Sequence, residues 1–178
     1  PLNVSREAFQ SSRVIHQLKN VVTSKVIDHL VNMASKDFEK YDKFCKEFGI
    51  FIKEGMATSQ EHFEALTGLV RFQTLDNGSQ FTSFKQYTEQ FREGQNKIYY
   101  IIGEEPSSLR NSPHLEAFKE RKIDVILFSD PVDPFMLINL KKFEDFDLIN
   151  VSSSDLELPE ATKDTEKPES ETPNAENI

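Results

Sequence analysis

Lys97-Ile98-Tyr99-Tyr100-Ile101-Ile102 is the run of sequence that decides the fold of this 178-residue chain. It is rich in β-branched and aromatic residues and closes at Gly103, which predicts a buried strand. Asp124-Val125-Ile126-Leu127-Phe128 predicts a second strand, and Asp147-Leu148-Ile149-Asn150-Val151 predicts a weaker third. Because these runs are apolar on both faces, we expect a short parallel sheet that is covered by helices on both sides.

The segments between these strands carry signals for helix starts. Ser112 offers an N-cap and Pro113 occupies the first helical position, with Leu115 and Phe118 expected to face inward. The stretch 130–133 repeats this pattern, with Asp133 closing a capping box. Strands that alternate with helices predict right-handed crossovers. Residues 95–154 are therefore expected to form a small αβα sandwich, within an α/β fold.

Residues 14–94 read as a helical connecting segment. Apolar residues recur every three or four positions from Val14 to Met33, which predicts a long amphipathic helix. A second helix is marked by apolar residues at helical spacing: Phe38, Tyr41, Cys45 and Phe48. Gly49 is expected near its end, and residues 58–61 have the form of a capping box that opens a third helix. Three successive helices predict a small bundle or coil between two α/β parts.

The net charge of −9 is concentrated at the end of the chain. From Asp155 to Ile178 there are eight acidic and two basic residues, giving −6, so the residues before them carry −3. This stretch also holds three prolines and no aromatic residue, and therefore predicts an acidic linker or a disordered tail over 155–178. A recognition role for the tail is the alternative. The acidity argues against nucleic acid as a partner, because that partner requires a basic face.

Composition also bounds the compartment. No apolar run approaches the roughly 18 residues of a membrane span, and no signal peptide is visible, so we expect no membrane partner. Cys45 is the single cysteine, which excludes an internal disulfide and fits a reducing cytoplasm. Its aromatic neighbours at helical spacing predict a buried packing role rather than a catalytic one.

The opening residues place Arg6 and Gln10 four positions apart at the expected start of a helix. Residues at this spacing share one helical face, so both side chains can reach one target. A guanidinium suits a phosphate group, and an amide beside it can orient a phosphate oxygen or a water. The spacing alone favours an ordinary surface arginine, because this pattern is common.

Six segments in order give the chain a specific resemblance. They are residues 1–10 (PLNVSRE…Q), 41–55 (YDKF…FG…KEG), 69–72 (LVRF), 93–101 (EGQNKIYYI), 112–116 (SPHLE) and 129–133 (SDPVD). Together they resemble the heat shock protein 90 (Hsp90) family of molecular chaperones, most of all its bacterial, HtpG-type members. The resemblance covers about residues 1–158, in the C-terminal part of the family's middle domain.

The resemblance implies a function for the opening residues. It makes residues 1–20 the end of the larger middle-domain part, with a catalytic loop in which Arg6 and Gln10 contact the γ-phosphate of ATP. Asn3 and Ser5 would support that loop. ATP and magnesium would be held by an N-terminal ATPase domain of the same chain, in a homodimeric parent that assists protein folding. We expect this piece, which begins with Pro1, to be an excised fragment that is inactive alone.

The resemblance also implies a client-binding surface. The position of Phe135 matches an aromatic residue that faces the cleft where bacterial relatives bind unfolded or partly folded client proteins, so Phe135 and Met136 are the client-binding candidates. Pro134 departs from the acidic residue that is usual before that aromatic. Simple core packing of both side chains is the alternative.

Two other classes of function compete with this interpretation. One is a pure interaction module in which Arg6 is incidental. The other is a stand-alone enzyme that uses loops at the carboxyl ends of the strands, where Glu104 and Glu105 lie; solvated loop carboxylates are favoured there. Asp130 and Asp133 are better explained as helix caps than as metal ligands. The four histidines show no metal-ligand spacing.

Overall fold

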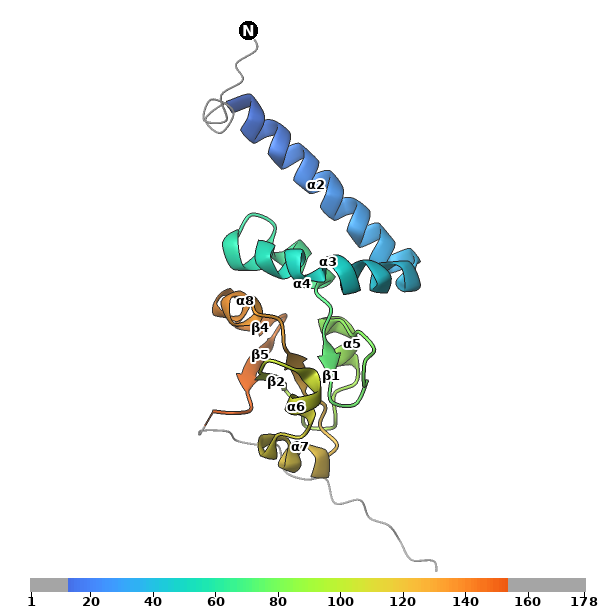
Figure 1. Ribbon diagram of the computed structural model, residues 1–178, viewed down its shortest axis with the longest axis vertical. Coiled ribbons are helices and arrows are strands. Elements are labelled where there is room, and N and C mark those ends of the chain that lie inside the picture. Colours follow the sequence, from blue (N-terminus) through green and yellow to red (C-terminus); the bar gives the residue numbers. More distant parts are fainter. Residues whose placement is uncertain (1–12, 154–178) are drawn as a thin grey trace, which may run out of the picture.

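The computed structural model describes residues 13–153, which form an elongated molecule (Figure 1). Its helical part consists of α2 (Arg13–Lys36), α3 (Phe38–Thr58) and α4 (Phe63–Leu69). The remaining elements form a sandwich around one sheet, and α7 lies at the end of the molecule opposite the start of α2 (Figure 1). Residues 1–12 and the acidic tail lie outside the described residues, so the predictions made for them stay predictions.

The sheet has five strands in the order β1-β3-β2-β5-β4. The strands are β1 (Gln73–Thr74), β2 (Lys97–Ile102), β3 (Ile126–Phe128), β4 (Lys142–Phe143) and β5 (Phe146–Asn150). β2 pairs in parallel with both β3 and β5, which confirms the three predicted strands and their direction. β1 and β4 add antiparallel edges that we did not predict, because two-residue strands have no periodicity to detect.

Helices cover both faces of the sheet, as an αβα sandwich requires. Alternate residues of β2 point to opposite faces, so Ile98 packs in one core and Tyr99 and Ile101 in the other. The first core also takes side chains from α3, α5 (Phe84–Glu89) and α8 (Asp133–Asn139). The second takes them from α6 (Pro106–Arg110), the 3-10 turn η1 (Pro113–Leu115) and α7 (Glu116–Glu120). Leu115 and Phe118 are buried there, as predicted.

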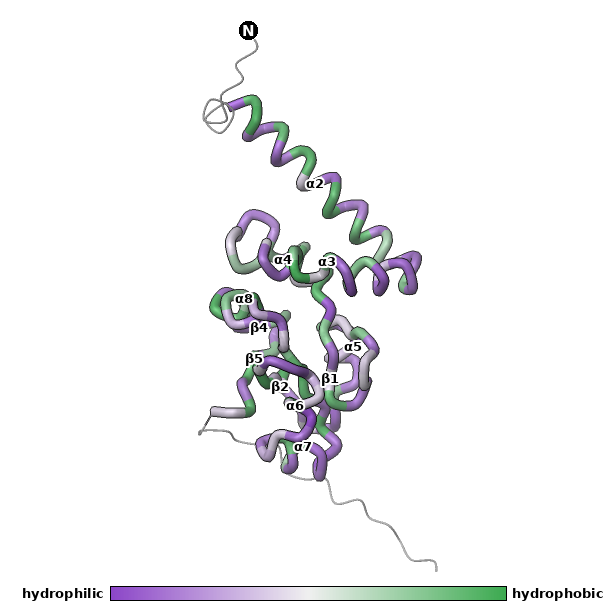
Figure 2. Tube along the Cα trace, viewed as in Figure 1, coloured by the Kyte–Doolittle hydropathy of each residue, from purple (hydrophilic) through white to green (hydrophobic). Residues whose placement is uncertain are grey.

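α2 is the long amphipathic helix that the sequence predicts, but only its C-terminal half is packed. Ile27, Leu30 and Ala34 are buried, whereas Val14 and Leu18 stay exposed. Apolar positions nevertheless recur along the whole helix (Figure 2). The difference arises because only the C-terminal half of α2 lies against α3. The N-terminal half of α2 extends away from the rest of the molecule (Figure 1).

The predicted end of the second helix is wrong. α3 passes through Gly49 and continues to Thr58. A Cβ atom at Gly49 would meet only the Cβ of Cys45, at 3.7 Å, so nothing in this glycine's surroundings stops the helix. Asp37 starts α3, because its side chain accepts a hydrogen bond from the backbone N–H of Lys40 at 3.1 Å.

The capping box predicted at residues 58–61 is also wrong. Thr58 still belongs to α3, and α4 begins only at Phe63 without a side-chain cap. Within residues 13–153, a complete capping box lies at Ser83 and Gln86, where it opens α5. Residues 73–94, expected in the helical segment, thus contain β1 and α5. Both belong to the sandwich: β1 pairs with β3, and Phe84 stacks on Phe143 with ring centroids 5.2 Å apart.

Candidate functional site

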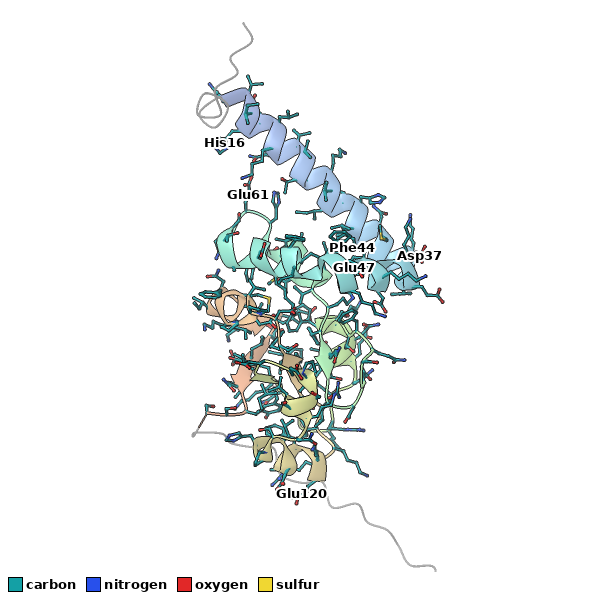
Figure 3. The ribbon with its side chains drawn as sticks, viewed as in Figure 1. His16, Asp37, Phe44, Glu47, Glu61 and Glu120 are labelled. Atoms are coloured by element: carbon teal, nitrogen blue, oxygen red, sulfur yellow. The ribbon has the colours of Figure 1, made fainter. Side chains whose placement is uncertain are left out.

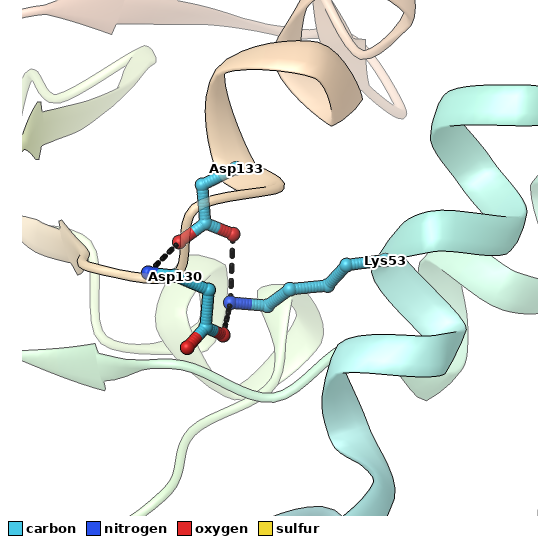
Figure 4. A network of polar contacts seen from close by, with 3 residues as sticks. All are labelled: Lys53, Asp130 and Asp133. Atoms are coloured by element: carbon cyan, nitrogen blue, oxygen red, sulfur yellow. Dashed lines mark hydrogen bonds and ion pairs between the residues drawn. The ribbon is translucent and has the colours of Figure 1, made fainter.

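A buried ion network joins α8 to α3. The Nζ atom of Lys53 lies 2.6 Å from Oδ2 of Asp130 and 2.7 Å from Oδ1 of Asp133 (Figure 4). Lys53 and Asp133 are buried, and the ammonium also lies 5.6 Å from the ring centroid of Phe128. Lys53 comes from the helical part, whereas Asp130 lies in the turn before α8 and Asp133 is the first residue of α8. This network therefore fixes the sandwich against the helical part. We call Lys53, Asp130 and Asp133 the α3–α8 clasp.

The clasp gives Asp130 and Asp133 a third role, beside the helix caps and the metal ligands that we weighed from the sequence. Asp133 Oδ2 accepts a hydrogen bond from the backbone N–H of Asp130 at 2.8 Å, which is half of the predicted capping box. The Asp130 carboxylate turns to Lys53 instead of completing it. Burial raises the pKa of Asp133, and the Lys53 ammonium opposes that rise. Within residues 13–153, no group of His, Cys, Asp or Glu is arranged to hold a metal ion.

Asn139 ties the other end of α8 to the end of α3. Its Nδ2 donates to the carbonyl oxygens of Met56 at 3.0 Å and Ala57 at 3.3 Å. These carbonyls lie in the last turn of α3, where backbone acceptors lack partners inside the helix. α8 is therefore held to α3 at both ends, by Asp133 and by Asn139, so its outer face has a fixed position.

Both helices of this junction carry exposed apolar side chains. Phe135 and Ile138 of α8 are 61% and 65% exposed, and Phe48 and Phe51 of α3 are 50% and 61% exposed. A groove of about 550 Å³ lies between the two helices. Its lining residues are Phe51, Glu54, Gly55, Ala57, Thr58, Val132 and Phe135. We call it the α3–α8 groove.

A second cavity continues this apolar surface. It measures about 530 Å³ and lies between α2 and the pair α3 and α4. Phe44, Phe48 and Phe51 line it from α3, and Val22 and Val26 line it from α2. Phe44 points toward α2 in Figure 3. Because Phe51 lines both hollows, they form one surface that runs from α2 to α8. We call this second hollow the α2–α3 cavity.

An exposed apolar surface of this kind is typical of sites that bind other proteins. Comparison with known proteins identifies the family of the chain. The family model described as Hsp90 protein matches residues 1–178. The chain belongs to the Hsp90 family. A chaperone protein HtpG of Treponema denticola is 40% identical over 95% of this chain and 28% of its own length. One from Francisella tularensis subsp. novicida is 39% identical over 97% of this chain and 28% of its own.

The fold agrees with that family. A solved structure described as the middle domain of a Plasmodium falciparum heat shock protein matches with a TM-score of 0.73 and 28% identity. The match covers 81% of this chain and 61% of that one. This chain is therefore an Hsp90-type middle-domain segment, as the six sequence motifs predict. It spans 28% of the length of the two HtpG relatives named above.

Phe135 and Met136, the two client-binding candidates, lie on opposite sides of α8. Phe135 is exposed, whereas Met136 is fully buried in the first core. Met136 therefore drops out as a surface residue. The helical period explains this, because Asp133, Met136, Leu137 and Leu140 face inward. Pro134, Phe135 and Ile138 face outward. Applied to the sequence alone, the helical period would have excluded Met136 from the exposed face of α8 and would have added Ile138 to it.

The other sequence candidates fall into two groups. Asn3, Ser5, Arg6 and Gln10 lie outside the described residues. Glu104 and Glu105 are exposed, and Glu105 accepts a hydrogen bond from the Ser107 hydroxyl at 3.2 Å. No histidine, lysine or cysteine lines the hollow of about 660 Å³ beside them. The two glutamates are thus solvated loop carboxylates, the interpretation that we favoured.

Two further expectations concern Cys45 and the membrane. Cys45 is buried, as predicted, and this burial raises the pKa of its thiol. Among residues 13–153, we find no helix that is both long and apolar enough to cross a bilayer.

Proposed function

We propose that this chain is the part of an ATP-dependent chaperone that holds unfolded or partly folded client proteins in the α3–α8 groove. The observation that carries the proposal is the pair Phe51 and Phe135, exposed on two helices and lining the same groove. Exposed apolar patches of this kind mark sites of protein interaction. The family membership supports a chaperone role, and the groove supports the client as the occupant.

The energetics suit reversible capture. Burial of one Phe side chain contributes about 1.5–3 kcal/mol, and association itself costs at least about 4 kcal/mol. Two aromatic anchors therefore roughly offset the cost of association. Net affinity then depends on the client's further contacts and stays weak enough for a chaperone cycle to release it. Because the clasp and Asn139 hold α8 on α3 at both ends, the aromatic pair is ordered before the client arrives.

Suppression of aggregation tests this proposal. The chain is mixed with thermally unfolding malate dehydrogenase, and light scattering is followed over time. Phe51→Ser with Phe135→Ser should abolish at least about half of the protection, because both anchors are lost. Val14→Ser with Leu18→Ser is the matched control, since both residues are exposed on α2 outside the groove. Equal protection by wild type and the Phe51/Phe135 variant would contradict the proposal.

In the same proposal the opening residues serve ATP hydrolysis. Arg6 donates to the γ-phosphate of ATP and stabilises the charge that develops on the transferred group, and Gln10 orients that phosphate or the attacking water. Asn3 and Ser5 shape the loop. ATP and magnesium belong to the N-terminal domain of the same longer chain. The resemblance of residues 1–10 to the family's catalytic loop supports these roles, and ATP turnover by the longer protein tests them.

The remaining parts of the proposal concern the assembly. The longer protein acts as a homodimer whose open and closed states differ in how the client surface is presented. Its compartment is the cytoplasm, which the single, unpaired Cys45 supports. A pure interaction module would use the same groove but would not depend on Arg6, so the two functions differ in the outcome of the ATP turnover experiment.

A further inference from the structure

We infer that the α3–α8 groove selects client segments in which apolar anchors are flanked by lysine or arginine. The inference rests on the proposed function, and it names the class of polypeptide that the groove prefers. Its basis is the sign of the exposed charge around Phe51, which family membership does not specify.

Every exposed charged residue between Glu47 and Val70 is a glutamate. The four are Glu47, Glu54, Glu61 and Glu64, and within residues 13–153 none of them is ion-paired. Lys53 is the one cation of that stretch, and it is buried in the clasp. Among the described residues, Glu54 is also the one charged residue that lines the groove, so the α3 side of the groove presents an unpaired negative charge.

Two of the glutamates, Glu54 and Glu61, line the hollows that a bound segment would occupy. Glu54 lines the groove together with Phe51 and Phe135. Glu47 precedes Glu54 by seven residues on α3, two helical turns and roughly 10 Å. Glu61 lines the α2–α3 cavity that shares Phe51. Figure 3 places Glu47 on α3 and Glu61 in the loop after it. Glu54 and Glu61 thus lie beside the aromatic rings that line the two hollows.

The basic groups nearby lie outside the groove lining. Lys43 and Lys46 precede the groove on α3, and Lys46 lines a separate hollow together with Glu47. Lys19 lines the α2–α3 cavity on the α2 side. Lys141 and Lys142 follow α8, and Lys142 is paired with Asp147 at 3.0 Å. The outer face of α8 carries no charge, since Pro134, Phe135 and Ile138 form it.

A client segment with apolar and cationic residues can contact both the exposed aromatic rings and the glutamate carboxylates. Its apolar residues bury Phe51 and Phe135, while its lysine or arginine side chains reach Glu54 and Glu47 and can also lie over the aromatic rings. An acidic segment would bring like charges together beside a desolvated surface. The acidic stretch 155–178, with eight acidic and two basic residues, is disfavoured as an occupant for the same reason.

Peptide binding to the full chain tests the inference. Three fluorescein-labelled peptides share a Phe-Ser-Leu-Phe core that is flanked on each side by two lysines, two glutamates or two serines. Fluorescence anisotropy at low salt should give a Kd at least about tenfold lower for the lysine peptide than for the glutamate peptide. The ratio should shrink as salt rises, because salt screens exposed charges.

Charge-neutral variants locate the effect. Glu47→Gln with Glu54→Gln should weaken the lysine peptide at least about threefold and leave the serine peptide unchanged. Glu116→Gln with Glu120→Gln removes the same charge from α7, at the far end of the molecule (Figure 3), and should leave all three peptides unchanged. Equal weakening by both double variants would overturn the inference, because the preference would then come from the net charge of the protein.

The remaining outcomes separate the inference from the proposed function. Equal affinity for the three peptides, lost in Phe51→Ser with Phe135→Ser, would overturn the charge preference and leave the groove as the client site. No binding of any peptide would overturn both. Self-association that depends on Phe51, seen by sedimentation, would make a second copy of the chain the occupant and would overturn the inference.

Discussion

Lys53 of α3 and Asp133 of α8 form a buried ion pair, with 2.7 Å between Nζ and Oδ1. The pair connects residues 80 positions apart in sequence and joins the helical part to the sandwich. It stands at the start of α8, two residues before Phe135. The position of Phe135, which we propose as a client-binding residue, is therefore set in part by a charge that comes from α3.

Loss of the clasp cation should be costly. Lys53→Met keeps most of the side-chain volume but leaves the carboxylate of Asp133 buried with no counter-charge. Removal of one partner of a buried pair typically costs about 3–5 kcal/mol of the free energy of unfolding. Urea denaturation followed by circular dichroism measures this loss.

The triple variant Lys53→Met, Asp130→Asn, Asp133→Asn is the control, because it removes the stranded charges as well. It should recover part of the lost stability. A single Lys53→Met variant as stable as wild type would show that the clasp contributes nothing to the junction.

The cost of Lys53→Met should depend on pH. Burial raises the pKa of Asp133, and Lys53 opposes that rise, so loss of Lys53 raises the pKa further. The folded variant then takes up a proton at a higher pH than the unfolded chain, whose aspartates titrate near about 3.9. Its stability falls as pH rises through that window. The deficit relative to wild type should be smaller at about pH 5 than at about pH 7.5, and urea midpoints at the two pH values measure it. A deficit that grows on acidification would contradict this assignment.

Asn139 should contribute less than the clasp. Asn139→Ala removes the donor to the carbonyls of Met56 and Ala57 and should cost about 1 kcal/mol, the net value of a typical hydrogen bond. Asn32→Ala is the matched control, because its Nδ2 donates at 2.9 Å to the Asp28 carbonyl within one exposed helix. Its effect should stay within about 0.5 kcal/mol. Equal losses in the two variants, from thermal unfolding curves, would show that Asn139 adds nothing specific to the junction.

The sequence predicted the local features of this fold well. The bounds of β2 match the run that we read as a strand, because the five consecutive β-forming residues from Ile98 to Ile102 leave little ambiguity. The end of α3 was misplaced, since glycine stops a helix only where the surrounding backbone requires it, and Gly49 lies in a regular helix. Phe135 and Met136 are neighbours in sequence but face opposite sides of α8. The helical period predicts this difference, whereas a search for clusters of apolar residues groups the two together.

Contacts between distant residues were not predictable. The pairing of Lys53 with Asp130 and Asp133 requires α3 to lie against the turn before α8, and no local pattern carries that information. The same holds for the groove, because Phe51 and Phe135 come from separate elements. Sequence analysis could name each helix face but not the face that would lie opposite.

The most direct test of the central claim is ATP turnover by the longer protein that contains this chain, with ATP affinity measured alongside. Arg6→Ala should lower turnover at least about tenfold with affinity nearly unchanged, because an arginine of this kind acts in the transition state. Arg13→Ala is the control: it removes an exposed arginine at the start of α2 and should leave turnover unchanged. Unchanged turnover in Arg6→Ala would contradict the catalytic role and leave this Hsp90 segment as a client- or partner-binding module.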